Sequence, residues 1–234
     1  MIPLRDDTPR YSTPYVNYFI IALNSLVFLF ELSIGAQSHR ALNNLIYQFG
    51  VVPHHFQLAL AGSPRFTLPV VLFTTLTSMF LHAGWLHLIF NMLFLWIFGD
   101  NVEDYLGHFS YLLFYFIGGF AAMLTHVLLN AGSTVPAIGA SGAIAGVMGG
   151  YFVLYPRARV MIWFPPIFFF YLPAWLVLGY WFVGQFLMGA ATSISETQNA
   201  GGVAVWAHVG GFLAGIVLIK LLPERPRRYR YAAW

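Results

Sequence analysis

The 234-residue sequence contains no cysteine, and charged residues make up only 8% of it. Without cysteine, the chain has neither a disulfide framework nor a thiolate for catalysis or metal binding. A soluble domain usually carries about a quarter charged residues, so this composition argues against one. Hydrophobic residues account for 59% of the chain and the mean hydropathy is +0.71. These values indicate a polytopic membrane protein with one compact domain.

The apolar residues gather into six segments, several of them long enough for a hydrocarbon core of about 30 Å. We expect an all-α polytopic membrane protein with six transmembrane helices and a long first outer loop. The expected helices cover residues 16–34, 86–99, 111–129, 141–155, a segment that ends near 189, and 203–222. Residues 35–80 are too polar to span and should form the loop, with short interfacial helices. The expected divisions are an N-terminal tail (1–14), a membrane domain (15–222) and a basic C-terminal tail (223–234).

The 11 basic residues are distributed unevenly between the two sides that six helices define. Nine of the 11 fall on the side of the two termini, and only Arg40 and Arg65 fall on the other side. Basic residues collect in cytoplasmic loops, so we expect both tails to be cytoplasmic. We expect an integral protein of a bacterial inner membrane. The net charge of +3 is not taken as a sign of nucleic-acid binding.

A serine flanked by glycines, in the sequence Gly139-Ala140-Ser141-Gly142, stands where a polar loop turns into an apolar helix. Glycines recur every four residues along that helix and share one face, which lets another helix approach closely within a bilayer. The segment around His208 carries a second small-residue face, and packing of the two faces would bring Ser141 to His208. The first face consists of Gly142, Gly146 and Gly150, and the second of Ala207, Gly211 and Gly215.

Ser141 and His208 are candidates for a nucleophile and its base. A serine hydroxyl is a weak nucleophile until a base takes its proton. The helix from Ser141 to Arg157 is about 24 Å long, which places Ser141 several Å below the outer membrane surface. His208 should lie at a similar depth in the last helix. Glu31 and the other acidic residues are expected at helix ends or in loops, so the residues predict a Ser–His dyad without an acid.

His87 and Asn91 lie four residues apart and face the same way on one helix. Together with backbone N–H groups near Ser141, they could donate hydrogen bonds to an oxyanion. Structural interpretations are also open. His87 and Asn91 could join helices or bind a metal, Ser141 could be incidental in a packed helix, and His208 could bond to a neighbouring helix. No carboxylate or thiolate lies near His87 and Asn91 in the sequence, so we expect no metal.

The ordered set of motifs resembles the rhomboid intramembrane serine proteases over residues 70–222. The motifs are His82, His87 and Asn91, then Phe98–Gly107, then Gly139-Ala140-Ser141-Gly142, and finally Ala207-His208 with Gly211. The resemblance implies a six-helix rhomboid core in which Ser141 is the nucleophile and His208 is the base. It implies an oxyanion hole of His87, Asn91 and the Ser141 backbone N–H, supported by Gly139, Gly142 and His82.

The resemblance also implies what the protein acts on. Family members cleave transmembrane segments of other membrane proteins near the outer surface, and they need neither metal nor ATP. We therefore expect a serine endopeptidase with transmembrane protein substrates, no cofactor and no nucleic-acid partner.

Two positions depart from the family pattern. Many members carry a Trp-Arg pair in the first loop, where this chain has Phe73-Thr74. Some carry a tyrosine one turn after the serine, which stacks on the catalytic histidine, and this chain has Ala145 there. The second departure leaves open what packs against His208, and an aromatic residue of the second or fifth helix is one possibility.

Two other classes of function use the same features. A non-catalytic rhomboid-like protein could bind membrane helices as a chaperone. A transporter or haem protein could use four histidines, which are His82, His87, His126 and His208. The sequence shows no repeated halves with interrupted helices in matched positions, which argues against a transporter.

The route of a substrate to Ser141 is expected beside the fifth helix. Pro165-Pro166 and Pro173 weaken the start of that helix, because proline lacks a backbone donor. The resemblance points to a gate between the second and fifth helices, with residues 190–202 as a lid. Trp181 or Phe182 would close this gate if its side chain faces the second helix.

Overall fold

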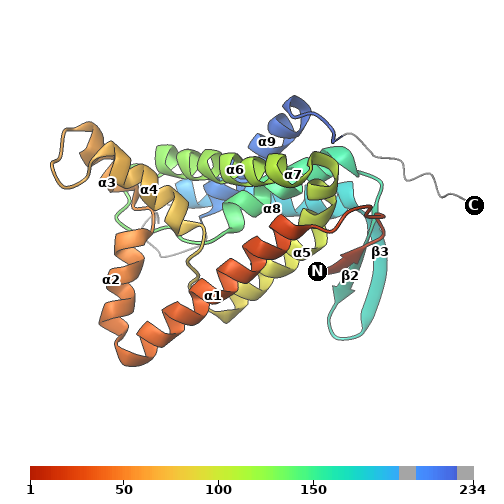
Figure 1. Ribbon diagram of the computed structural model, residues 1–234, viewed down its shortest axis with the longest axis horizontal. Helices are drawn as coiled ribbons and strands as arrows, with labels where there is room; N and C mark the ends of the chain where they lie inside the picture. The colour runs from red at the N-terminus through yellow and green to blue at the C-terminus, as the bar shows by residue number, and fades with distance from the viewer. Residues whose placement is uncertain (195–203, 226–234) are drawn as a thin grey trace, which may run out of the picture.

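The computed structural model describes residues 1–194 and 204–225, and Figure 1 shows how its elements are arranged. Within these ranges the chain forms nine helices and three strands. The helices are α1 (Tyr15–Gln37), α2 (His39–Phe49), α3 (Pro53–Leu60), α4 (Leu68–Ser78), α5 (Trp85–Leu106), α6 (His108–Leu129), α7 (Ser141–Leu154), α8 (Ala174–Ile194) and α9 (Val205–Leu221). The strands are β1 (Ile2–Asp6), β2 (Arg159–Phe164) and β3 (Phe168–Pro173).

Six helices correspond to the six predicted apolar segments, namely α1, α5, α6, α7, α8 and α9. The predicted end of the second one, at residue 99, is wrong, because α5 continues to Leu106. Among the described residues, α1, α5, α6 and α8 are long and apolar enough to cross a membrane, and α4, α7 and α9 are shorter apolar helices. The protein is therefore a mostly helical membrane protein. Most of the lid predicted at residues 190–202, and most of the predicted basic C-terminal tail, lies outside the described residues.

The prediction of an all-α fold is wrong, because the chain also forms a three-stranded antiparallel sheet in the order β1-β2-β3. Along β2, Val160 and Ile162 are buried whereas Met161 and Trp163 are partly exposed, which is the alternation of a half-buried strand. β1 lies in the stretch predicted as an N-terminal tail, and it pairs with β2 so that Asp6 lies opposite Val160. The segment after α7 is so uniformly apolar that its sequence gives no clear period. Within it β2 pairs with the neighbouring β3, and the third strand, β1, comes from the other end of the chain.

An ion pair and a backbone hydrogen bond attach the N-terminal stretch to this sheet. Arg159 Nε donates to Asp7 Oδ2 at 2.9 Å, and the Asp7 backbone N–H donates to the Arg159 carbonyl at 3.1 Å. Because the Arg159 side chain donates this bond, the pKa of the Asp7 carboxyl lies below its usual value of 3.8. The bond is therefore present above that usual pKa and is lost as the pH falls through the lowered one.

The start of α1 is held by α5. Glu103 of α5 is buried, and its carboxylate accepts hydrogen bonds from the backbone N–H groups of Val16 and Asn17, at 3.0 and 2.7 Å. Helix α1 has no capping side chain of its own, so Glu103 satisfies donors that the first turn would leave free. The side-chain amide of Asn17 also donates to the carbonyl of Leu95 at 3.0 Å. These bonds fix the position of α1 beside α5.

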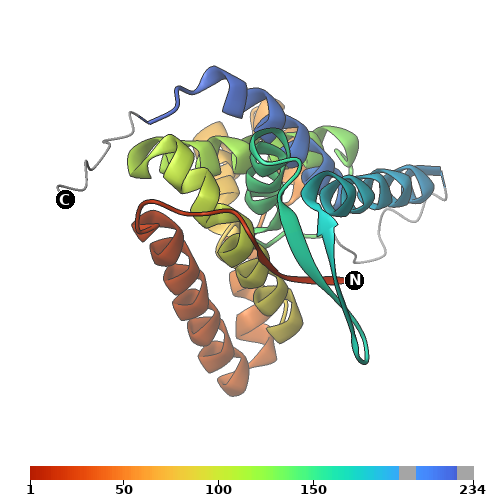
Figure 2. The same ribbon diagram turned by 90° about the vertical axis from the view of Figure 1, so that its right-hand side faces the viewer.

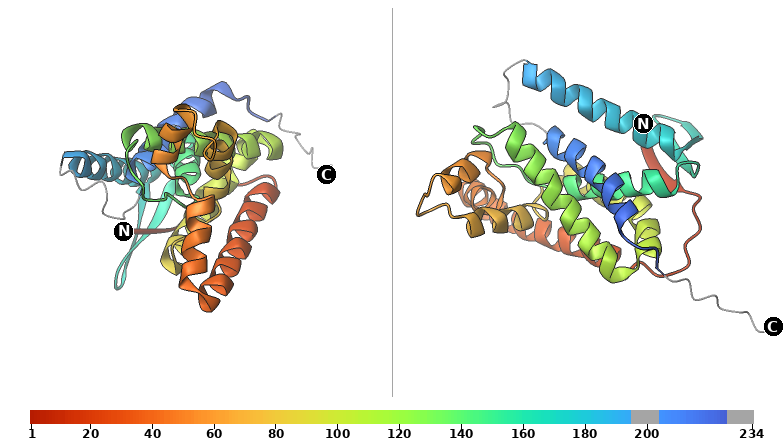
Figure 3. Two further views of the ribbon diagram at one scale, coloured as in Figure 1. Left: turned by 90° about the vertical axis from the view of Figure 1, so that its left-hand side faces the viewer. Right: turned by 90° about the horizontal axis from the view of Figure 1, so that it is seen from above.

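The elements divide between the two ends of the molecule. Helices α2, α3 and α4 lie at one end, and the sheet and the turn between α5 and α6 lie at the other (Figure 1). Helix α8 stands at the edge of the bundle beside α9, as Figures 2 and 3 show. Among the described residues, no Cα atom of α8 comes within 8 Å of a Cα atom of α5. Contacts with α9, α7 and the sheet, rather than with α5, therefore hold α8 in place.

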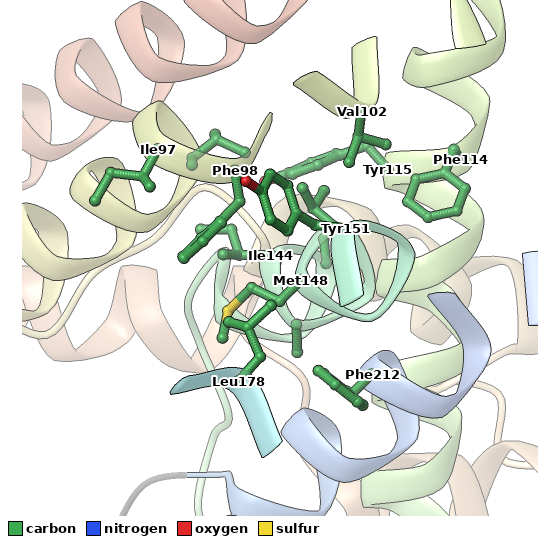
Figure 4. Close-up of a cluster of buried hydrophobic side chains, with 14 of the residues drawn as sticks. Ile97, Phe98, Val102, Phe114, Tyr115, Ile144, Met148, Tyr151, Leu178 and Phe212 are labelled. Atoms are coloured by element: carbon green, nitrogen blue, oxygen red, sulfur yellow. The ribbon is translucent and has the colours of Figure 1, made fainter. Parts of the chain in front are cut away.

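Helix α7 lies at the centre of the hydrophobic core. Figure 4 shows large side chains of α5, α6, α8 and α9 converging on Ile144, Met148 and Tyr151 of α7. Glycines bring α7 and α9 into backbone contact. A Cβ atom on Gly146 would lie 3.4 Å from the Gly211 carbonyl oxygen, and one on Gly215 would overlap the Gly146 backbone. The predicted packing of the two small-residue faces is confirmed.

Candidate active site

Ser141 is the first residue of α7, and it follows a loop that neighbouring segments hold in place. Gly139 has a φ angle of +124°, a conformation that favours glycine. Its N–H donates to the carbonyl of Ser78, at the end of α4, over 2.8 Å. Earlier in the loop, Ala137 and Val51 exchange two backbone hydrogen bonds of 2.7 and 3.0 Å. These bonds fix where α7 begins and thereby where the Ser141 side chain lies.

His208 lies in the first turn of α9, and its ring meets Ser141. Nε2 of His208 is 2.7 Å from Oγ of Ser141. The close approach depends on small residues, because a Cβ atom on Gly211, one turn after His208, would overlap the backbone of Gly142, next to Ser141. The structure thus brings together the serine and histidine that the sequence pairs. When the imidazole is neutral, Nε2 accepts the serine hydroxyl proton and the ring proton resides on Nδ1.

A residue of α8 accepts a hydrogen bond from that Nδ1–H group. Gln185 Oε1 lies 2.7 Å from His208 Nδ1. Gln185 did not figure in the sequence prediction, which considered only acids as partners for His208. It carries the one carboxamide side chain in α8, and a polar residue inside a membrane helix is a functional candidate by default. That signal was sufficient to mark Gln185, but nothing in the sequence directed it towards His208.

Trp181 of α8 packs against His208, which answers the question that Ala145 left open in the sequence. The centroids of the Trp181 and His208 rings are 5.7 Å apart, and Trp181 also contacts the ring of Phe212, with centroids 6.1 Å apart. Phe182 stacks on Phe212 with centroids 4.8 Å apart. Trp181 and Phe182 therefore both pack towards α9. The condition for the predicted gate, that one of them face the second membrane helix, is not met.

His87 of α5 lies beside the loop that leads to Ser141. A Cβ atom on Gly139 would be 2.7 Å from both Nε2 and Cε1 of His87, and 3.7 Å from Oγ of Ser141. Glycine therefore leaves the space that the imidazole occupies. The backbone N–H of Ala83 is 3.4 Å from His87 Nδ1, so Nδ1 of the neutral ring accepts and Nε2 carries the proton. A proton donor thus faces the loop next to the serine.

Asn91 lies one turn after His87 on α5 and is buried. Its Nδ2 is 3.0 Å from Nε2 of His82, and Nδ1 of His82 is 3.3 Å from the Phe80 carbonyl. The bonds are consistent with a neutral His82 ring that donates to Phe80 and accepts from the Asn91 amide. Because an amide group has two N–H donors, Asn91 keeps a second one for another acceptor.

The expectation that Glu31 lies at a helix end or in a loop is wrong. Glu31 is buried inside α1, where only 2% of its surface is exposed. Its two carboxylate oxygens lie 3.1 and 3.3 Å from the backbone nitrogen of His82. The two ring nitrogens of His208 bond to Gln185 and Ser141, so Glu31 acts elsewhere than on His208.

Within the part of the chain that the structure describes, no group of three or more His, Asp or Glu side chains could hold a metal ion. The rings of His82 and His87 are close, with centroids 5.1 Å apart. Their hydrogen bonds to Phe80, Asn91 and Ala83 already account for three of the four ring nitrogens. The arrangement therefore places the Ser141 hydroxyl against a neutral imidazole, with hydrogen-bond donors of His87 and Asn91 from α5 nearby.

Comparison with known proteins gives a consistent family. The pattern of the Rhomboid domain matches residues 70–225, which is about two thirds of the chain. Rhomboid protein 1, mitochondrial, of Saccharomyces cerevisiae is 31% identical over 170 residues, which cover 67% of this chain and 44% of that protein. Rhomboid-like protein 11, chloroplastic, of Arabidopsis thaliana is 32% identical over 162 residues, or 64% of this chain and 52% of the relative.

A third similar protein is the presenilin-associated rhomboid-like protein, mitochondrial, of Bos taurus. It is 30% identical over 150 residues, which cover 60% of this chain and 36% of the relative. The chain therefore spans about half the length of these relatives or less. Since the domain pattern matches most of the chain, including the segments that carry Ser141 and His208, the protein belongs to the rhomboid family.

Proposed function

We propose that this protein is an intramembrane serine endopeptidase that cleaves transmembrane segments of other membrane proteins. The observation that carries the proposal is the 2.7 Å contact between Ser141 Oγ and His208 Nε2, with His208 Nδ1 bonded to Gln185. A nucleophile and its base require this arrangement, in which the serine hydroxyl bonds to one imidazole nitrogen and a second group bonds to the other nitrogen. Membership of the rhomboid family supports the same class of reaction.

In the proposed reaction, Ser141 Oγ attacks the scissile carbonyl carbon while His208 Nε2 takes the hydroxyl proton. The imidazolium then returns this proton to the leaving amine as the C–N bond breaks, which leaves an acyl-enzyme. A water molecule then gives a proton to Nε2 and attacks the ester carbonyl carbon. The C–Oγ bond breaks, and the imidazolium returns the proton to Ser141 Oγ, which restores the enzyme. Throughout, Gln185 accepts the hydrogen bond from Nδ1 and keeps Nε2 directed at the serine.

The carbonyl oxygen becomes negatively charged during the attack and needs donors close by. We assign this role to His87 Nε2, to the second N–H of the Asn91 amide and to the backbone N–H of Ser141. Ser141 is at the N-terminus of α7, where the helix dipole also favours negative charge. The three donors come from two helices that pack against each other, which would hold them in place before the substrate arrives.

We also propose that all six helices predicted as spans cross the membrane, with both termini on the cytoplasmic side, where most basic residues fall. A bacterial inner membrane is our prediction for the compartment. Helix α7 has 14 residues and is about 21 Å long, which is shorter than a hydrocarbon core of about 30 Å. Ser141 would then lie below the outer membrane surface, so the scissile bond must enter the membrane domain.

The test is reaction with a fluorophosphonate probe, together with cleavage of a model transmembrane substrate by the protein in liposomes. The wild-type protein should be labelled and should cleave, and Ser141→Ala should do neither. His208→Ala should also be inactive, and the double variant no worse than either single one, because the two groups act as a unit. Ser25→Ala is the matched control, since Ser25 of α1 donates only within its own helix, to Ile21 at 2.8 Å.

Two outcomes would contradict the proposal. Cleavage by a folded Ser141→Ala variant would mean that another group is the nucleophile. Wild-type protein that binds a transmembrane helix, but is neither labelled nor able to cut it, would instead identify a non-catalytic helix-binding protein.

A further inference from the structure

A buried carboxyl group in the first membrane helix has no part in the reaction proposed above. Glu31 is 2% exposed and lies in the apolar helix α1. An ionisable group inside a membrane domain is costly unless protein groups bond to it, so such a residue usually has a function. The carboxylate of Glu31 accepts from the backbone N–H of His82, with its two oxygens 3.1 and 3.3 Å from that nitrogen.

The residue that Glu31 holds is connected directly to the proposed oxyanion hole. The His82 backbone bonds to Glu31, and its ring bonds on one side to the Phe80 carbonyl and on the other to the Asn91 amide, at 3.3 and 3.0 Å. A displacement of the His82 backbone would therefore move the acceptor that orients the Asn91 amide. That amide must point its second N–H at the oxyanion.

The same short segment also holds the serine loop. The carbonyl of Ser78, four residues before His82, accepts the N–H of Gly139 at 2.8 Å. The segment from Ser78 to His82 is thus bonded to the loop before the serine at one end and to the oxyanion donor at the other. Phe28, one turn before Glu31 on α1, adds edge-on ring contacts to His82 and Trp85, with centroids 6.4 and 5.1 Å apart.

We propose that Glu31 is a positioning residue, which fixes the Ser78–His82 segment through the His82 backbone and thereby aims the Asn91 amide at the oxyanion. This inference rests on the proposed protease function. It assigns α1, which lies outside the matched Rhomboid domain of residues 70–225, a part in arranging the reacting groups.

A carboxyl group in α1 that served only to pack helices would behave differently. Asn24 provides the comparison, because it lies two turns earlier on the buried side of the same helix, and its amide donates to the carbonyl of Ile20 in α1 itself. Removing the Asn24 side chain disturbs the packing of α1 without breaking a bond to the Ser78–His82 segment. Glu31→Gln keeps one acceptor oxygen of the same reach, while it removes the charge and replaces the second oxygen with an NH2 group.

The first experiment measures kcat and KM for a transmembrane substrate in liposomes. Glu31→Ala should lower kcat by about 10-fold to 100-fold, the loss expected when a catalytic group is misplaced by about 1 Å, and should leave KM within about twofold. Glu31→Gln should keep most of the turnover, and Asn24→Ala should match the wild type. In an Asn91→Ala background, Glu31→Ala should cause little further loss, because the group that it positions is already gone.

The second experiment does not require activity. Amide hydrogen exchange of the peptide covering residues 79–88 should be faster in Glu31→Ala than in Asn24→Ala or the wild type, since the His82 N–H loses its acceptor. Unchanged exchange, or the same fold loss of kcat in the Asn91→Ala background as in the wild type, would overturn the role of Glu31. Failure of the wild-type protein to react with the fluorophosphonate would overturn the protease function instead, while the exchange result would still test the bond.

Discussion

Oε1 of Gln185 lies 2.7 Å from Nδ1 of His208, so a side chain of α8 orients the imidazole of α9. In many serine hydrolases a carboxylate holds the catalytic histidine in this way. A neutral amide oxygen supplies the same geometry, because it accepts a hydrogen bond from the Nδ1–H group and leaves Nε2 free to take the proton of Ser141.

Replacing Gln185 with a side chain of similar shape that lacks this acceptor should slow the reaction. We expect Gln185→Met to lower kcat by about 100-fold, the low end of what positioned acid–base groups contribute. The check is turnover of a transmembrane substrate in liposomes. Val183→Ala is the control, because Val183 is a largely exposed residue of the same helix at 53%. Equal activity of Gln185→Met and Val183→Ala would show that His208 needs no partner at Nδ1.

Trp181 of α8 contacts His208, the proposed base, because their ring centroids are 5.7 Å apart. If Trp181 were a gate residue, its loss would speed up cleavage of transmembrane substrates only. Because it packs on His208, we expect Trp181→Ala to slow hydrolysis of a small soluble ester and of a transmembrane substrate alike, by about 10-fold each.

The ester and the transmembrane substrate should be measured side by side, with Tyr180→Ala as the control, because Tyr180 is 67% exposed. Trp181→Phe keeps an aromatic ring beside His208 and should recover part of both rates. Faster transmembrane cleavage with unchanged ester hydrolysis would return Trp181 to the role of a gate.

We expect alanine substitutions at two glycines to change the stability differently, one at the contact between α7 and α9 and one away from it. A Cβ atom on Gly215 would overlap the backbone of Gly146, so Gly215→Ala should destabilise the protein by about 1–3 kcal/mol through overpacking. Nothing lies within 4 Å of a Cβ atom on Gly184 in α8. Gly184→Ala should therefore be neutral or stabilise by up to about 1 kcal/mol, since alanine favours the helix.

Thermal unfolding in one detergent, followed by circular dichroism, compares the two glycine variants directly. A lower Tm is expected for Gly215→Ala alone. Equal melting temperatures for the two variants would mean that α7 and α9 separate enough to accommodate a methyl group, and that their contact is looser than the structure has it.

The sequence alone predicted the features that local patterns determine. Runs of apolar residues marked six of the helices, because length and hydropathy suffice to recognise a membrane helix. The glycine faces on two of these helices predicted which would approach each other most closely, and so predicted the meeting of Ser141 and His208. The spacing of His87 and Asn91 by one helical turn placed them on the same face as candidate donors, and the family motifs supported this role.

Tertiary structure alone decided the partners of these residues. Gln185, Trp181 and Glu31 act through contacts with residues far away in the chain, and the rotation and offset of packed helices, which no local pattern encodes, determine which side chains meet. The sheet shows the same limit, because β2 pairs not only with the neighbouring β3 but also with β1 from the opposite end of the sequence. Composition and periodicity specify which segments form helices and which faces are smooth, whereas hydrogen bonds between distant elements depend on how those faces pack.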